Sequence, residues 1–223
     1  MTRYSSTDAV KELGSDAASI RKKTATVVGL GALGSAVAET LARMGVNLRI
    51  IDKDRIYEED LDKLSLFSSE HASKFKAKEA KKLLEDINPD IKVKAFHEEL
   101  VENNAFLVDA DVIIECSNNE NTAGLVDGAR QDTPLVYTRA AGVKGGVVVL
   151  DDTTLKDVSK FLDKHAPKAQ QGEILGSTVR LTAGLAVSKA LKILTGQRHE
   201  KSFLQVDGWQ FSIEKSTVRK DKK

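Results

Sequence analysis

Short apolar runs alternate with stretches in which apolar residues recur at helical spacing. The first run covers residues 25–28, and a second covers residues 48–51. Between them, Val37, Leu41 and Met44 are spaced to lie on one face of a helix that Gly45 ends. Strands that alternate with helices in this way are typical of βαβ units, whose strands are parallel. The first half of the chain is therefore predicted to form a parallel sheet.

The same reading extends along the rest of the chain. Helices are predicted over residues 73–87, 156–165 and 177–194, weaker helical turns over 103–107 and 121–130, and strands over 91–96, 111–116, 135–138 and 147–150. Residues 142–146 turn the chain back on itself, and residues 203–213 contain strand-like pieces with Trp209 as a core anchor. The predicted fold class is α/β, with a Rossmann-like sheet, a parallel first half, antiparallel additions in the C-terminal part and helices on both faces.

The predicted domain organisation is simple. Residues 1–23 form an N-terminal arm with a short amphipathic helix that breaks near Gly14. Residues 24–223 form a single domain with a polar crossover loop over about 151–172. A chain of 223 residues is long enough for one full core.

A glycine-rich turn follows the first strand, with Gly29, Gly31 and Gly34 in GxGxxG spacing. The first glycine allows a tight turn, the second lets a phosphate approach the backbone, and the third lets the helix pack against the strand. The first amides of the helix, including those of Ala32 and Leu33, favour an anion. Asp52 ends the second strand, 23 residues after Gly29, where a carboxylate accepts from ribose hydroxyls. The motif predicts a nucleotide site; the alternative is a domain of this shape without a ligand.

Composition and charge exclude several classes of partner and site. The net charge of +1 gives no reason to expect nucleic acid or a membrane surface as a partner. No segment resembles a signal peptide or a membrane span, so we expect a cytoplasmic protein. Cys116 is the only cysteine, which rules out an internal disulfide and a zinc site made of cysteines. We interpret it as a small apolar side chain in the core.

Polar residues follow the strand predicted over 111–116. Ser117, Asn118 and Asn119 come directly after it. In an open α/β sheet the carboxyl ends of the strands border the ligand crevice. These three residues are therefore site candidates by position, and Arg139 is predicted to lie at the same edge, either in an ordinary ion pair or in place of another cation.

The order of these motifs resembles the ThiF/MoeB/HesA family, the prokaryotic relatives of ubiquitin-activating enzymes. The resemblance covers about residues 3–196 and is carried by VVGLGALGS, IIDKD, LDKLSLF, KFKAKEAKKLLEDINP, DADVIIECSNN, PLVYTRAAGVKGGVVV and LTAGLAVSKALKILTG. It implies an ATP-dependent adenylyltransferase that acts on the C-terminal glycine of a ubiquitin-like or sulfur-carrier protein. It also implies a homodimer or a heterodimer.

The resemblance implies roles for individual residues. Gly29, Gly31, Gly34, Asp52 and Asp54 would hold the nucleotide together with the helix start at Ala32 and Leu33. Lys76 would contact phosphate oxygens, and Lys63 stands where the family usually has arginine. Asn118 and Asn119 replace an Asp-Asn pair whose aspartate serves Mg²⁺. An amide brings no charge, so Mg²⁺ binding is expected to be weakened unless Glu115 or the ATP phosphates compensate. Lys76, Lys63 and Asn118 are the catalytic candidates.

Departures from the family pattern keep other functions open. Ser6 replaces an arginine that reaches a neighbouring subunit in relatives, and the zinc-binding cysteine pairs and the thioester cysteine of some relatives are missing. One alternative is a non-catalytic subunit of a heterodimer that binds a nucleotide or only its partner. Another is an NAD-linked oxidoreductase, although no hydride-transfer residues stand out. A relative that adenylates RNA bases is a further alternative, which the near-neutral charge does not favour.

Overall fold

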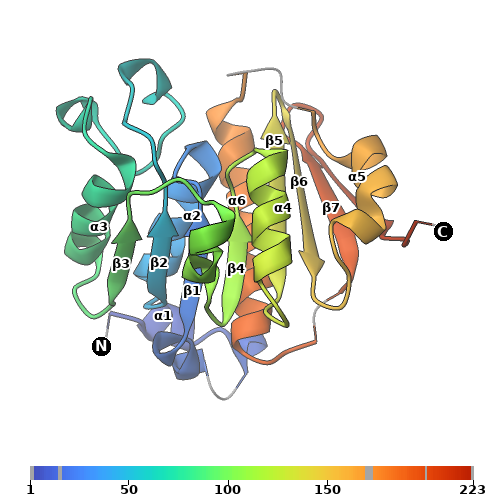
Figure 1. Ribbon diagram of the computed structural model, residues 1–223. Helices are drawn as coiled ribbons and strands as arrows, with labels where there is room; N and C mark the ends of the chain where they lie inside the picture. Colours follow the sequence, from blue (N-terminus) through green and yellow to red (C-terminus); the bar gives the residue numbers. More distant parts are fainter. Residues whose placement is uncertain (1–2, 15–16, 169–172, 199, 222–223) are drawn as a thin grey trace.

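The computed structural model describes residues 3–14, 17–168, 173–198 and 200–221. In this part of the chain eight strands form one sheet, in the order β3-β2-β1-β4-β5-β6-β7-β8 (Figure 1). The first five strands pair in parallel and the last three add on antiparallel. The strands are β1 Thr24–Val28, β2 Asn47–Ile51, β3 Val93–Phe96, β4 Val112–Glu115, β5 Leu135–Ala141, β6 Lys144–Leu150, β7 Ser202–Asp207 and β8 Ser212–Thr217.

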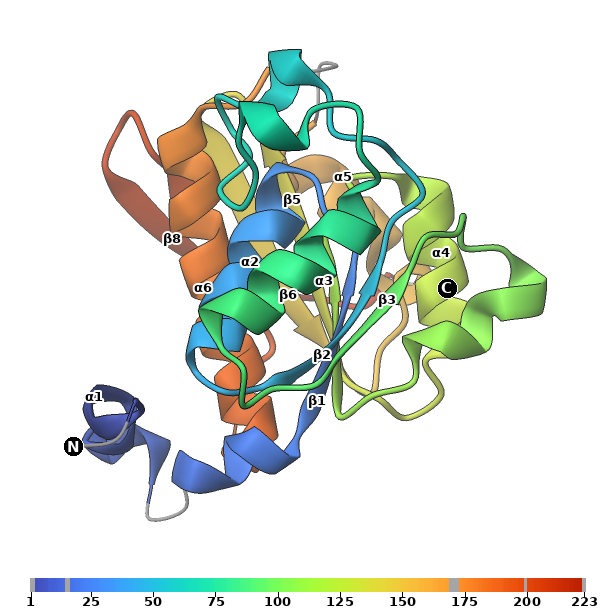
Figure 2. The same cartoon turned by 90° about the vertical axis from the view of Figure 1, so that its left-hand side faces the viewer.

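Helices cover both faces of the sheet (Figure 2). One apolar core joins the sheet to α2, α3 and α6, and a second joins it to α4 and α5 on the opposite face. The helices are α1 Ser5–Asp8, α2 Ala32–Arg43, α3 Lys76–Ile87, α4 Glu120–Ala129, α5 Ser159–His165 and α6 Gly176–Leu194. Short 3₁₀ turns span Lys11–Leu13, Ala17–Lys22, Glu58–Asp60, Ser69–His71, Glu102–Val108 and Lys156–Val158. The predicted fold class is confirmed. None of the helices described has the length and apolar content needed to cross a membrane.

Side chains alternate between the two cores along each strand. On β1, Ala25 and Val27 belong to the α2 side and Val28 to the α4 side; on β4, Ile113 belongs to the α4 side. Strands buried on both faces read as continuous apolar runs, which is the pattern seen in the sequence. The order of the strands reverses between β1 and β4, because β2 and β3 extend one way from β1 and β4 and β5 the other. Ligands of open α/β sheets bind at such a switch point.

Two boundaries differ from the prediction for local reasons. Helix α3 begins at Lys76 rather than residue 73, because Ser73 is left-handed (φ 66°) and Phe75 is extended. Strands β5 and β6 are longer than the predicted 135–138 and 147–150, since they form one hairpin in which Ala141 pairs with Lys144. The glycines of residues 142–146 therefore lie largely within paired strands.

The N-terminal arm packs against the amino edge of the sheet. The Tyr4 hydroxyl donates to Asp90 (3.0 Å), and the side-chain amide of buried Asn88 donates to the Tyr4 hydroxyl (3.0 Å). Instead of one broken helix, the arm contains α1 and two 3₁₀ turns, with residues 15–16 outside the described part. Ser6 is exposed on α1, at the end of the molecule opposite the carboxyl edge (Figure 2).

The prediction for Trp209 is wrong. Trp209 lies in the turn between β7 and β8 and is 68% exposed, and nearby Phe211 is 94% exposed. The apolar character of this segment suggested burial, but the hairpin extends beyond the helices that cover the rest of the sheet. The helix predicted over 156–165 is present as a 3₁₀ turn followed by α5, while residues 169–172 of the predicted crossover loop lie outside the described residues.

Candidate functional site

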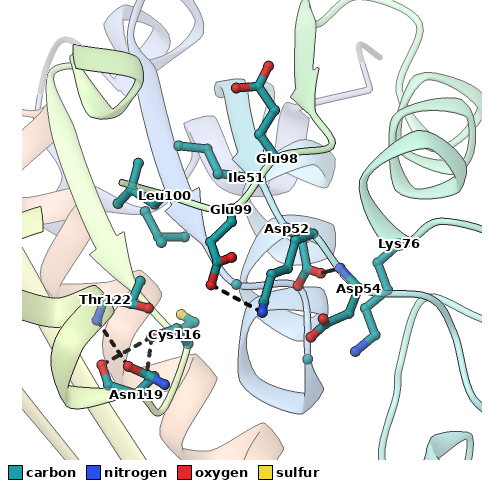
Figure 3. A pocket seen from close by; sticks show the side chains of 15 residues that line it. Ile51, Asp52, Asp54, Lys76, Glu98, Glu99, Leu100, Cys116, Asn119 and Thr122 are labelled. Carbon is teal, nitrogen blue, oxygen red and sulfur yellow. Dashed lines mark hydrogen bonds and ion pairs between the residues drawn. The ribbon is translucent and has the colours of Figure 1, made fainter. Parts of the chain in front are cut away.

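A cavity of about 240 Å³ opens at the carboxyl edge of the sheet, at the switch point between β1 and β4 (Figure 3). Its walls come from the turn after β1, the end of β2, the start of α3 and the turn after β4. Seven of the predicted site residues line it: Gly29, Gly31, Asp52, Asp54, Lys76, Ser117 and Asn119. We call this cavity the switch-point pocket.

The glycine turn forms the floor of the pocket. Gly29 has a φ of +84°, and a Cβ atom there would lie 2.7 Å from the Cα atom of Ser117. A Cβ at Gly34 would lie 1.7 Å from the Gly29 carbonyl oxygen, so only glycine lets α2 begin this close to β1. At Gly31 a Cβ would meet nothing within 4 Å, because this residue faces open space. The turn is thus closed on the protein side and open towards the pocket.

Asp52 braces the glycine turn from the end of β2. Its Oδ2 accepts from the Leu30 amide (2.6 Å) and its Oδ1 from the Asp54 amide (2.7 Å). The side chain is 8% exposed, and burial raises its pKa, although the two amides and the charge of Lys76 oppose that rise. A carboxylate has about four lone-pair sites, so these two bonds leave acceptor capacity for a ligand.

Lys76 is the first residue of α3, and only 7% of it is exposed. Its amide donates to the Asp54 carbonyl (3.0 Å), which ties the start of α3 to the segment after β2. Figure 3 shows its side chain beside Asp54 at the pocket. A cation at a helix N-terminus opposes the helix dipole. An anionic ligand would relieve that unfavourable charge.

The chain matches the ThiF family over residues 4–223. It belongs to the ThiF family. The match covers the glycine turn, Asp52, Lys76 and the turn after β4 in one continuous stretch.

Two relatives show what the family contains. The chain is 29% identical over 228 residues to the sulfur carrier protein ThiS adenylyltransferase of Bacillus subtilis (strain 168), covering 97% of this chain and 67% of the relative. It is 27% identical over 179 residues to the protein of the same description from Escherichia coli (strain K12), covering 76% of this chain and 71% of the relative. Both relatives are therefore longer than the part this chain matches.

Solved structures agree on the fold. The crystal structure of E. coli MccB with ATP superposes with a TM-score of 0.81 over 98% of this chain and 72% of MccB. Only 17% of the aligned residues are identical, so this likeness supports the fold alone.

Two of the three catalytic candidates, Lys63 and Asn118, are not in the lining of the switch-point pocket. The Lys63 ammonium pairs with Asp60 (2.6 Å) and lies 4.0 Å from Asp62. Asn118 has a left-handed backbone (φ 55°) and lines a second cavity of about 490 Å³ together with Tyr137 and Arg139. Asn119 differs from Asn118 in that it borders both cavities. The side-chain oxygen of Asn119 accepts from the Thr122 amide (3.0 Å) and thereby caps α4.

Ala32, Leu33 and Gly34 begin α2 directly after the glycine turn. Leu33 and Gly34 are buried and Ala32 is half-buried, and their side chains do not line the pocket in the described residues. Any contribution to ligand binding would come from the helix N-terminus itself.

At the end of β4, Glu115 forms a buried ion pair with Arg139. Both side chains lie on the α4 face, because Glu115 is opposite Tyr137 in the β4–β5 register and Arg139 is two residues further along β5. One Glu115 oxygen accepts from Arg139, and the other accepts from the Ser117 amide (2.8 Å) and hydroxyl. Of the two arrangements predicted for Arg139, the structure shows the ordinary ion pair.

These contacts decide how well the turn after β4 suits Mg²⁺. Hard cations prefer several oxygen ligands, among which carboxylates bring the charge. Both oxygens of Glu115 are already engaged, and Asn118 brings no charge and faces the second cavity. In the described residues no group of three or more His, Cys, Asp or Glu side chains is arranged to hold a metal ion. The residues of the turn after β4 therefore do not fit a protein-bound Mg²⁺.

Several residues of the pocket wall are not among the predicted site residues. Glu98, Glu99 and Leu100 follow β3, and Lys53 follows β2. The Lys53 ammonium pairs with Glu99 (3.2 Å), and both residues line the pocket. These residues come directly after parallel strands, so the strand-end rule that selected Ser117 to Asn119 would also have selected them.

Cys116 is buried at 4% exposure beside the glycine turn. Burial raises the pKa of its thiol to about 12, with a weak contact from the Thr138 hydroxyl acting in the opposite direction. A thiol with such a pKa is not a nucleophile at neutral pH. Its burial among apolar side chains agrees with the predicted core position.

Proposed function

We propose that this ThiF-family chain binds ATP in the switch-point pocket and adenylates the C-terminal glycine of a small ubiquitin-like or sulfur-carrier protein. The observation that carries the proposal is the convergence of the glycine turn, Asp52, Asp54 and Lys76 on one pocket, in a chain that matches the family over residues 4–223. Two adenylyltransferases of sulfur carriers among its relatives support the same class of reaction.

In the proposed reaction a carboxylate oxygen of the carrier attacks the α-phosphorus of ATP. A new P–O bond forms, the bond to the β-phosphate oxygen breaks, and pyrophosphate leaves with the electron pair. The products are a carrier acyl-adenylate and pyrophosphate. No cysteine is needed for this step, so the buried state of Cys116 is compatible with it.

Each residue of the pocket has a proposed task. The open side of Gly31 and the first amides of α2 hold phosphate oxygens through the helix dipole. Asp52 accepts from ribose hydroxyls with the lone pairs that the Leu30 and Asp54 amides leave free. The Lys76 ammonium offsets negative charge that grows on the phosphate in the transition state.

ATP–pyrophosphate exchange tests the catalytic part of the proposal. Purified full-length chain, Mg·ATP and labelled pyrophosphate are incubated with candidate carriers that end in Gly-Gly, and with the same carriers lacking the last glycine. Exchange that depends on the terminal glycine supports the proposal. Measurable ATP binding without exchange for any carrier would overturn adenylation and leave nucleotide binding.

A non-catalytic nucleotide-binding subunit of a heterodimer is the second candidate. It is favoured by two charged candidates that already have partners within the chain: Lys63, in the segment between β2 and α3, is paired with Asp60, and Arg139 on β5 is paired with Glu115. On this proposal the chain binds ATP, and Asn118→Asp does not create exchange activity. Exchange by the purified chain alone would exclude it.

Further features remain part of the proposal. We propose an arm over residues 1–23 and one domain over 24–223, assembly as a homodimer or heterodimer, and a cytoplasmic location. Sedimentation of the purified chain across a concentration series measures the assembly directly.

A further inference from the structure

The guanidinium of Arg139 lies in a cage of oxygen atoms at the end of β4. It donates to the Glu115 carboxylate, to the Thr138 carbonyl (2.8 Å) and, at 3.5 Å, to the Asn119 carbonyl. The Tyr137 ring covers one face, with its centroid 4.1 Å from the Arg139 Cζ atom. One carboxylate and two carbonyl oxygens are the kind of donor set that a hard cation prefers.

The cage is built and buried. Arg139 is 5% exposed and Glu115 is fully buried. The second Glu115 oxygen accepts from the Ser117 amide and hydroxyl, so the carboxylate is held in place from both sides.

We propose that Arg139 is the resident cation of this edge, which closes Glu115 to divalent metal and makes the nucleotide site independent of a side-chain metal ligand. The metal part of this inference rests on the cage alone, whereas its link to the nucleotide rests on the proposed function. The reason for the link is position: Ser117 and Asn119, which the cage holds, also line the switch-point pocket.

Binding of Mn²⁺ to the nucleotide-free full chain, followed by the electron paramagnetic resonance signal of free Mn²⁺, tests the closed cage. Wild type and E115Q are expected to give the same titration. R139A removes the guanidinium but leaves the oxygens, so it is expected to gain one Mn²⁺ site that E115Q/R139A lacks. A wild-type Mn²⁺ site that E115Q abolishes would overturn the proposal, as would a folded R139A without the new site.

The affinity for AMP tests the link to the nucleotide, because AMP itself binds Mg²⁺ weakly. For wild type, the Kd for AMP is expected to change less than about twofold between EDTA and saturating Mg²⁺. For R139A it is expected to change at least fivefold. R130A is the matched control, since Arg130 is also buried, pairs with Asp127 and donates to the Thr133, Asp151 and Thr153 carbonyls, away from the pocket. Its Kd for AMP should respond to Mg²⁺ as that of wild type does.

Two further measurements keep the outcome decisive. Millimolar guanidinium is expected to raise the Tm of R139A and not that of wild type. If R139A does not fold, the charge-free variant E115Q/R139M replaces it: a Mn²⁺ titration identical to that of wild type supports the proposal, and loss of a wild-type site overturns it. If AMP does not bind at all, the proposed function fails while the Mn²⁺ titrations still decide the cage.

Discussion

The two halves of the carboxyl edge use their charged groups in opposite ways. On the β1–β2 half, Asp52 and Lys76 line an open cavity, and each is anchored by backbone amides rather than by an opposite charge in direct contact. On the β4–β5 half, Glu115 and Arg139 are buried against each other. The first half is prepared for a ligand and the second is neutralised within the chain.

The difference teaches what each half is able to do. A backbone amide fixes the position of a carboxylate without consuming its charge, so Asp52 stays available to a ligand. A buried ion pair consumes both charges and is strongly destabilised when one partner is lost. We therefore propose that a nucleotide binds on the β1–β2 half, while the neutralised pair of the β4–β5 half contributes shape.

The largest effect should come from opening the buried pair. Glu115→Gln leaves the Arg139 charge buried without its counterion, and we expect unfolding in urea to show a loss of about 3–5 kcal/mol. The double variant Glu115→Leu/Arg139→Met removes both charges and should lie within about 2 kcal/mol of wild type. If the double variant loses as much as the single one, the two charges do not act as a pair.

A smaller effect is expected from Asp52→Asn in the open half. The amide keeps one acceptor but presents its NH₂ group to the Leu30 or Asp54 amide. We expect calorimetry to show ATP binding weakened about 10- to 100-fold, equivalent to about 1.4–2.8 kcal/mol. Asp111→Asn is the control, since Asp111 also accepts from a backbone amide, that of Thr24 (2.8 Å), but lies at the amino end of β1 outside the pocket, and about threefold or less is expected. Equal losses would contradict the bracing role of Asp52.

The two lysines sharpen the comparison further. Lys76→Met should weaken ATP binding about tenfold, a typical loss of about 1.4 kcal/mol for one charge-assisted contact. Lys63→Met should change it less than about twofold, because Asp60 already neutralises that charge. Neither change should affect adenosine, which has no phosphate. A loss of adenosine binding in Lys76→Met would show that the lysine acts on the shape of the pocket.

The smallest effect is the one that ATP is expected to have on the labelling of Cys116, which lies between the two halves. Burial raises the pKa of its thiol to about 12, so the thiol is protonated at pH 8. Iodoacetamide should label it in the native chain at least about 100-fold more slowly than in urea, since the reactive form is the thiolate. Saturation with ATP should leave the native rate nearly unchanged. Fast labelling of the native chain would show that the glycine turn opens.

Much of the open half could be predicted because its parts are close in the sequence. The glycine turn, α2 and β2 lie within residues 29–52, and a GxGxxG turn between a strand and a helix with an acid at the next strand end has one common arrangement. Asn119 was found from its place at the end of a strand. Lys53 and Glu99 also follow the carboxyl ends of parallel strands, β2 and β3, so their position in the sequence was sufficient to predict them.

The closed half could not be predicted in the same way. Arg139 meets Glu115 only through the β4–β5 register, which places both side chains on the α4 face. Asn118 leaves the switch-point pocket because its backbone is left-handed, and no residue type forces that conformation. Trp209 is exposed because the β7–β8 hairpin extends past the helices, although its residue type favours burial.

The sequence by itself determined the α/β fold, the glycine turn and the acid at the end of β2, since these follow from local periodicity and from backbone conformations that glycine permits. Only the tertiary structure decided which charges remain open to a ligand. Whether a charged side chain is open to a ligand depends on its neighbours in space, and Glu115, Arg139 and Lys63 are already paired within the chain.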